Sequence, residues 1–173
     1  MELFDEASTA IHEMDSKKLD IALANAVAML STTDFLMEFL KPLHVYINDE
    51  CNGGSIRYIQ EKFAKLCVRN CLSNLSTKFK SVKDEGPRLL IGSLIAEYEN
   101  LDTLMHIIVA QNIGWNVTYV GNGIPHDELI YMANEIKARA MIIALNTERD
   151  IARKSHEIKT IKNLADQKDN IIL

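Results

Sequence analysis

The period of the hydrophobic pattern changes once along this chain, near residue 80, and this change limits the fold more than any single motif does. Before it, apolar residues recur every three or four positions, as in amphipathic helices. After it, short continuous apolar runs alternate with segments of helical periodicity. A chain of 173 residues with 47% hydrophobic residues has the composition of one compact domain or two small ones and is not disordered. We therefore expect a helical domain followed by an α/β domain.

Residues 1–80 predict a four-helix bundle, because four apolar stripes follow one another with short connections. The stripes cover residues 3–14, 19–30, 35–47 and 56–75. Asp15 or Ser16 is placed to cap the second helix, and Pro42 predicts a kink or a delayed start in the third. The fourth helix is expected to begin at Ser55, after Asn52, Gly53 and Gly54 end the third. Its expected buried face comprises Ile56, Ile59, Phe63, Leu66, Cys67, Asn70, Cys71 and Leu75.

Residues 81–87 (SVKDEGP) are polar and predict a linker, and residues 88–173 predict an α/β domain. Strands are expected at residues 88–95, 116–120, 141–145 and 171–173, and helices at 101–113, 125–139 and 147–167. Alternation of strand and helix indicates a doubly wound parallel sheet. A sheet that ends with a strand lacks the helix that would cover it, so we expect this domain to be truncated at its C-terminus.

Charge and composition exclude several classes of protein. The net charge is -5 and the pI is near 5.5, so no overall positive field attracts nucleic acid. No apolar run reaches the roughly 18 residues of a membrane span and no signal sequence is visible, which predicts a cytoplasmic protein without a membrane partner. The three cysteines lack metal-site spacing and are expected to be reduced thiols. No phosphate loop, zinc motif or Ser-His-Asp set appears, so we expect neither a catalytic residue nor a metal ligand.

Two segments carry a resemblance to a known family. Residues 53–64 (GGSIRYIQEKFA) resemble a cap segment, and residues 114–121 (GWNVTYVG) with Pro125 resemble the signature GW-x-V-x-x-LG-x-x-x-P. Both belong to the cobalamin-binding module of corrinoid methyl carriers, methionine synthase and light-sensing MerR-type repressors. The resemblance covers about residues 5–173 and implies a four-helix cap followed by a Rossmann- or flavodoxin-like domain. It also implies a small-molecule ligand, cobalamin, between the cap and the sheet.

The sequence departs from this family at the positions that face cobalt. The family's ligand histidine belongs to a D/E-x-H-x-x-G motif, but residues 97–102 read EYENLD. Glu99 occupies the position of the histidine, and Asp102 occupies the position of the glycine. In the same comparison, Asn146 replaces a serine and Cys51 replaces the tryptophan over the upper face of the cofactor. The pair Glu61-Lys62 replaces Glu-His.

These departures change the chemistry that the resemblance implies. A carboxylate is a poorer ligand than imidazole for cobalt in a corrin, so Glu99 is not expected to replace the histidine. Cobalamin with its own benzimidazole as lower ligand, or another flat macrocycle, remain the alternatives. Gly121 could let a ligand approach the backbone, although a tight turn explains it as well. The expected cofactor-binding residues are Cys51, Tyr58, Glu61, Lys62, Glu97, Tyr98, Glu99, Asp102, Gly121 and Asn146.

His106 is a further candidate because it follows Asp102 by four positions on an expected helix, where a carboxylate and an imidazole would lie together. A solvent-facing histidine without a function is the alternative.

The resemblance favours a sensory module, the effector domain of a MerR-type transcriptional regulator, over an enzyme. Such a module would form homo-oligomers and contact DNA only through an N-terminal basic domain that this sequence lacks. Two alternatives stay open. One is a protein-protein assembly module without a cofactor, whose cleft is filled by its own side chains, and the other is a corrinoid methyl carrier.

Overall fold

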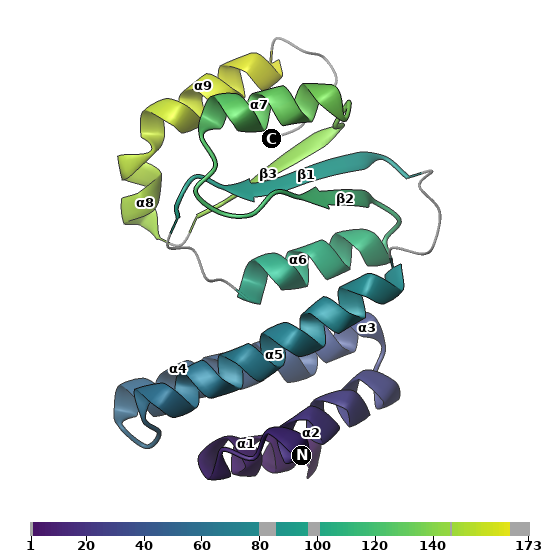
Figure 1. Cartoon of the computed structure of the whole chain (residues 1–173), viewed down its shortest axis with the longest axis vertical. Helices are drawn as coiled ribbons and strands as arrows, with labels where there is room; N and C mark the ends of the chain where they lie inside the picture. Colours follow the sequence, from purple (N-terminus) through teal and green to yellow (C-terminus); the bar gives the residue numbers. More distant parts are fainter. Residues whose placement is uncertain (1, 80–85, 97–100, 146, 167–173) are drawn as a thin grey trace. The chain divides into compact units, whose positions relative to one another are not determined.

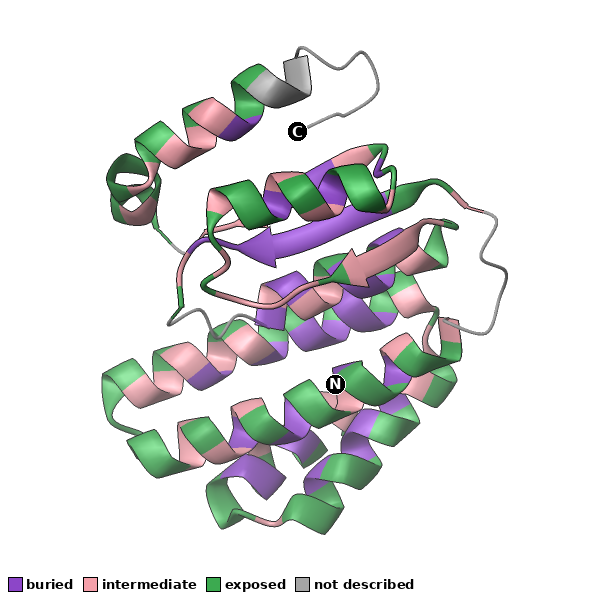
Figure 2. Ribbon diagram, turned by 45° about the horizontal axis from the view of Figure 1, so that its top comes forward, coloured by how far each residue is buried: buried purple, intermediate pink, exposed green. Residues whose placement is uncertain are grey.

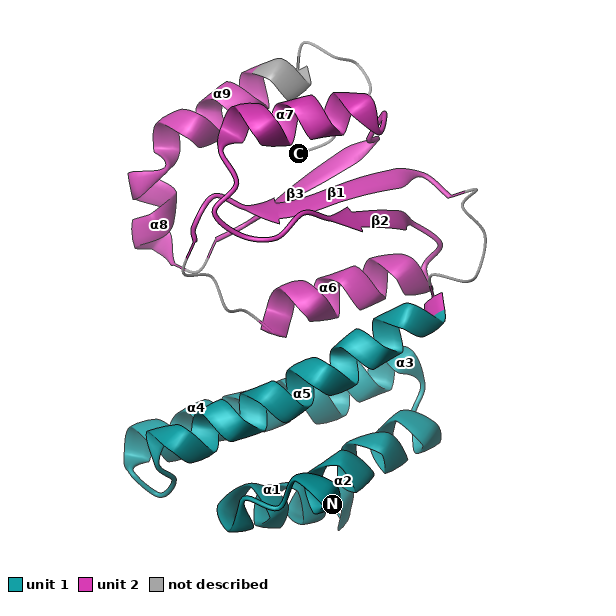
Figure 3. Ribbon diagram, in the orientation of Figure 1, with its two compact units in different colours: residues 1–78 teal, residues 79–173 magenta. Residues whose placement is uncertain are grey.

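The computed structural model describes residues 2–79, 86–96, 101–145 and 147–166, the side chains of 164–166 excepted, in two compact units. The first unit spans Met1–Lys78 and the second spans Phe79–Leu173 (Figures 1 and 3). The unit boundary falls at the end of the last helix of the first unit, and most of the linker predicted at 81–87 lies outside the described residues. Among the described helices, none is long and apolar enough to cross a membrane.

The first unit is helical throughout. Its elements are α1 (Glu2–Glu13), α2 (Ser16–Met29), α3 (Thr32–Asp34), η1 (Phe35–Leu40), α4 (Lys41–Gly53) and α5 (Tyr58–Phe79). The backbone stays helical from α3 through η1 into α4, so these three elements form the third of the four predicted helices. The four-helix prediction is therefore confirmed, with a π-helical segment that the sequence did not indicate.

Local signals place the helix ends. The Asp15 carboxylate accepts a hydrogen bond from the backbone N–H of Lys18 at 3.1 Å and so caps α2. Gly54 ends α4 in the left-handed conformation, at φ 80°, where a side chain would be strained. Pro42 lies in the first turn of α4, directly after the π-helical segment. Because the backbone is already helical before Pro42, the delayed start offered as one of its two effects is wrong.

The predicted buried face of α5 is wrong in part. Ile59 is 59% exposed and Leu66 is 56% exposed. The buried residues of α5 are Ala64, Cys67, Val68, Leu72 and Leu75. The helix α5 begins at Tyr58 and not at Ser55, so Ile56 lies outside it. A helical repeat counted from Ile56 therefore does not predict which residues of α5 are buried. The helix carries two adjacent apolar stripes, and only packing selects between them.

The second unit is a parallel α/β layer structure. Its elements are β1 (Arg88–Ser93), α6 (Leu101–Asn112), β2 (Asn116–Tyr119), α7 (His126–Glu135), β3 (Ala140–Ala144), α8 (Glu148–Arg153) and α9 (Ser155–Asp166). The described strands pair in the order β2-β1-β3, all parallel, with Leu90 opposite Thr118 and Met141. The helix predicted over 147–167 is broken at Lys154, which leaves the helical conformation. The strand predicted at 171–173 lies outside the described residues.

Helices cover both faces of the sheet, so the doubly wound prediction is confirmed. On one face, Leu89 and Ile91 of β1 pack with Ile107 of α6. On the other, Leu90 packs with Leu129 of α7 and residues of α9. The central strand β1 is buried along almost its whole length (Figure 2). Gly92 permits this packing, because a Cβ there would lie 2.8 Å from Leu129 Cδ2 and 2.9 Å from Val120 Cγ2.

Replacing Leu129 should destabilise the α/β unit. Leu129 is fully buried between α7 and the sheet, so Leu129→Ala is expected to lower the free energy of unfolding by about 2–5 kcal/mol. Urea unfolding followed by the fluorescence of Trp115, the single tryptophan and a residue of this unit, measures the change. Tyr131→Ala on the same helix is the control, because Tyr131 is 60% exposed and should cost under about 0.5 kcal/mol. Equal losses in the two variants would contradict the assigned packing.

Candidate ligand-binding site

The strand order determines where a ligand would enter the second unit. The chain leaves β1 toward α6 on one face and leaves β3 toward α9 on the other. The topological switch point therefore lies at the carboxyl ends of β1 and β3, the usual ligand position in open parallel sheets. Residues 97–99 follow β1 and Asn146 follows β3, so the sequence assigns all four to this edge, and all four lie outside the described residues.

Backbone hydrogen bonds join the loops at this edge. The Ser93 N–H donates to the Gly121 carbonyl at 3.0 Å, and the Ile124 N–H donates to the Ser93 carbonyl at 2.9 Å. The Gly123 N–H donates to the Ile95 carbonyl at 3.2 Å. The Ser93 hydroxyl is buried and accepts the Ile95 N–H at 3.1 Å, so the serine completes its own turn. These bonds tie the end of β1 to the loop that follows β2.

Gly121 and Gly123 shape this loop through their backbone conformation. Their φ angles are 89° and 68°, in the region where L side chains are strained. A Cβ on Gly121 would meet no atom within 4 Å, so crowding does not require this glycine. The turn therefore explains Gly121, and the same geometry leaves its backbone open to an approaching molecule.

Asp102 lies in the first turn of α6, where its charge suits the positive end of the helix dipole. The His106 ring Nδ1 lies 2.6 Å from the backbone carbonyl of Asp102, so His106 bonds to the main chain. Among the residues that the structure describes, no group of three His, Cys, Asp or Glu side chains is arranged to hold a metal ion.

The four predicted residues of the cap form two contacts at the start of α5. The Cys51 thiol, near the end of α4, donates to Glu61 Oε2 at 3.1 Å. The Lys62 ammonium lies 5.3 Å from the centroid of the Tyr58 ring. Lys65 forms an ion pair with Glu61 and completes the first contact. Sequence reasoning missed Lys65, although its position four residues after Glu61 is a recognisable signal.

Electrostatics in this cluster keep the Cys51 thiol protonated. The Lys65 ammonium bonded to Glu61 holds the pKa of that carboxyl below its usual range. The hydrogen bond to the Glu61 carboxylate, helped by burial, raises the pKa of Cys51. Cys51 is therefore a neutral donor at neutral pH and not a thiolate, the form that binds metals. All three cysteines are free thiols, as predicted.

No protein-family model matches this chain, and no curated protein matches it. Among solved structures, the chain is similar to the monomethylamine corrinoid protein of Methanosarcina barkeri. The two share 12% sequence identity over 98% of this chain and 81% of that protein, with a TM-score of 0.77.

Two further solved structures have lower scores. A cobalamin-binding protein from Desulfitobacterium hafniense DCB-2 has 9% identity over 93% of this chain and 77% of its own, with a TM-score of 0.45. A chain of the methanol:cobalamin methyltransferase complex of Methanosarcina barkeri has 13% identity over 96% of this chain and 63% of its own length, with a TM-score of 0.42.

The fold is thus shared with the monomethylamine corrinoid protein, and here it consists of a helical unit followed by a Rossmann-like α/β unit. The sequence of residues 97–100 contains no histidine, and the carboxylates of Glu97 and Glu99 are poorer ligands than imidazole for cobalt in a corrin. The open backbone at Gly121 fits contacts with the periphery of a ligand.

Removing the Glu61 charge should make Cys51 more reactive. In Glu61→Gln the thiol loses its charged acceptor, so its pKa falls and its thiolate fraction rises. Alkylation of Cys51 by iodoacetamide at pH 8, followed by peptide mass spectrometry, should accelerate severalfold. Asp49→Asn removes an equal charge from an exposed site on α4 and should leave the alkylation rate of Cys51 unchanged. The alkylation rate of the buried Cys67 should be unchanged in both variants. An unchanged rate for Cys51 in Glu61→Gln would show that this hydrogen bond does not control the thiol.

Proposed function

We propose that this chain is a cobalamin-binding module that contacts the periphery of the cofactor and leaves benzimidazole, the cofactor's own base, as the lower ligand of cobalt. The observation that carries the proposal is the likeness of fold to a corrinoid protein over 98% of the chain. The missing histidine in residues 97–100 supports base-on binding over coordination by the protein.

Each unit, taken by itself, carries groups that we propose for contacts with the cofactor. In the α/β unit they are the backbone at Gly121 and the side chains of residues 97–99, Asp102 and Asn146. In the cap they are the Tyr58 ring with Lys62, and the neutral Cys51 thiol bonded to the Glu61 carboxylate. A neutral thiol and an exposed aromatic ring are better suited to contact a large, weakly charged macrocycle than to bind a metal ion.

We propose that the module acts as a sensor and not as a catalyst, with a change of oligomeric state as its output. The replacements at Cys51, Lys62 and Glu99 support this role, since methyl carriers need a ligand and surrounding groups that tune cobalt. A corrinoid methyl carrier is the second candidate, and it is favoured by the fold shared with the monomethylamine corrinoid protein.

Purified protein incubated in the dark with adenosyl-, methyl- or hydroxocobalamin and then desalted should retain visible absorbance with a base-on spectrum. Tyr58→Ala should retain less, because the exposed Tyr58 ring is lost, whereas Tyr131→Ala removes an equally exposed tyrosine of α7 and should retain as much as the wild type. A shift in size-exclusion elution on loading supports the sensor, and unchanged elution supports the carrier. A colourless protein would overturn cobalamin binding and favour an assembly module without a cofactor.

Restoring the family motif should change how cobalt is held. The double variant Glu99→His with Asp102→Gly is expected to bind cobalamin about 10–100-fold more tightly, because an imidazole then ligates cobalt. Its absorption spectrum should change to one in which the benzimidazole is displaced. Glu135→His, which places the same side chain at an exposed site at the end of α7, is the matched control and should leave affinity and spectrum unchanged. No gain in the double variant would argue against every corrinoid-based function.

A further inference from the structure

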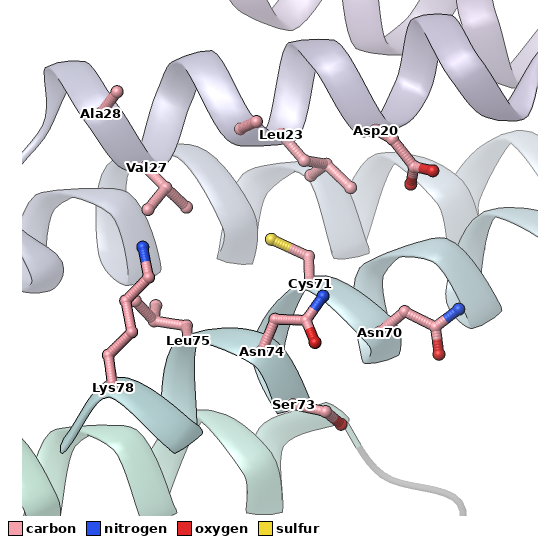
Figure 4. A pocket seen from close by; sticks show the side chains of 11 residues that line it. Asp20, Leu23, Val27, Ala28, Asn70, Cys71, Ser73, Asn74, Leu75 and Lys78 are labelled. Atoms are coloured by element: carbon pink, nitrogen blue, oxygen red, sulfur yellow. The ribbon is translucent and has the colours of Figure 1, made fainter. Parts of the chain in front are cut away.

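A groove lies within the first unit, between α2 and α5 (Figure 4). Its volume of about 670 Å³ falls in the range of small-molecule sites, roughly 300–1,000 Å³. None of its lining residues belongs to the set that we propose for cobalamin. The lining residues are Asp20, Leu23, Ala24, Val27, Ala28, Asn70, Cys71, Ser73, Asn74, Leu75 and Lys78.

The middle of the groove is apolar and neutral. Leu23 and Leu75 are buried and form an apolar wall. Ala24 and Ala28 on α2 are too short to fill the space in front of α5. The Cys71 thiol points from α5 toward α2 (Figure 4), and burial raises the pKa of this thiol to about 11, so it is uncharged at neutral pH. This part of the groove suits an apolar group.

The two ends of the groove carry charges in different situations. Asp20 and Asn70 lie at one end, and Lys78 lies at the other (Figure 4). Asp20 is exposed, and no side chain that the structure describes forms an ion pair with it. Lys78, in contrast, already has an interaction partner. The Asp20 end is therefore the one that can bind a further charged group.

The Asp20 charge also outweighs the Lys78 charge in the middle of the groove. After burial, which has the largest effect, the Asp20 carboxylate raises the pKa of Cys71 more than the Lys78 ammonium lowers it. The same carboxylate raises the pKa of Cys67, one turn earlier on α5, where burial is again the larger cause. The potential around these thiols is thus negative and favours a cation over an anion.

We propose that this groove binds a primary amine with an apolar tail. Its ammonium lies beside the Asp20 carboxylate, where the side-chain oxygen of Asn70 can accept a further hydrogen bond. Its tail lies along Leu23, Leu75 and the Cys71 thiol. Asp20 and Ala28 are eight residues apart on α2, which corresponds to about 12 Å of groove and leaves room for a tail.

The lining selects this class of ligand over related ones. A carboxylate with the same tail would meet the negative potential of Asp20, and Lys78 already has a partner. A polyamine would place additional charges against Leu23 and Leu75, where they would lose water without gaining a counter-charge. The ion pair is open to solvent, so binding should be weak, in roughly the millimolar range, and the charge should add up to about fivefold.

Titration of the full ¹⁵N-labelled chain with 4-phenylbutylamine, followed by NMR at pH 7, tests the proposal. Saturable shifts of the Asn70 and Asn74 side-chain amide signals are expected. The neutral analogue 4-phenylbutanol should bind up to about fivefold more weakly, because it lacks the charge that Asp20 attracts. The anionic analogue 4-phenylbutyrate should bind more weakly than the alcohol.

Variants of the first unit separate the charge from the shape of the groove. Asp20→Asn should remove the preference for the amine over the alcohol, whereas Asp49→Asn, at an exposed site on α4 outside the groove, should keep it. Ala28→Trp should abolish the shifts by filling the groove. Asn25→Trp, at an exposed site on α2 that does not line the groove, should keep them.

The Cys71 thiol supplies a second readout that needs no bound amine. A cationic methanethiosulfonate, with a trimethylammonium-ethyl group, and an anionic one, with a sulfonatoethyl group, both modify thiols. The ratio of their rates at Cys71 does not depend on the thiolate fraction, so it reports the local potential. This ratio should fall severalfold in Asp20→Asn and stay unchanged in Asp49→Asn.

Three results would overturn the proposal. They are no saturable shift at millimolar amine, equal affinity for the amine and the alcohol, and a rate ratio at Cys71 that Asp20→Asn leaves unchanged. Cobalamin retention, measured by absorbance in the same variants, should equal that of the wild type, so failure of one site is separable from failure of the other.

Discussion

The structure of the second unit depends on the burial of one strand, β1, on both faces and along both edges. Parallel neighbours on each side require crossover connections, and these connections are the helices that cover the sheet. Because β2 and β3 lie on opposite sides of β1, the chain must pass from one face of the sheet to the other. The switch point at the end of β1 is therefore a consequence of burying Leu89, Leu90 and Ile91.

Backbone geometry holds the loops at this edge, which explains how the fold accommodates changed site residues. The bonds of Ser93 to Gly121 and Ile124 use main-chain atoms, and the two glycine conformations need no particular neighbour. A likeness of fold at 12% identity is consistent with this, since apolar pattern and backbone bonds survive the exchange of most side chains. In the family that the sequence resembles, coordination of cobalt depends on a single imidazole, and the resemblance aligns Glu99 with that position.

Helix α5 has three separate roles in the first unit. Its buried stripe, which includes Ala64 and Leu72, packs in the helical core. Its first turns hold Glu61 between the Cys51 thiol and the Lys65 ammonium, which keeps the thiol neutral. Its last turns form one wall of a groove against α2, lined in part by Leu23 and Leu75.

The sequence by itself determined the change from helices to α/β alternation, because hydrophobic period, Gly, Pro and capping residues act locally. Asp15 begins α2 and Gly54 ends α4 where predicted, since each acts on the backbone close to it in sequence. The buried stripe of α5, the π-helical segment and the break at Lys154 were decided by tertiary structure. So was the groove between α2 and α5, which depends on small residues meeting across two helices that are distant in sequence. Local propensity cannot encode that meeting, because packing alone selects which faces oppose each other.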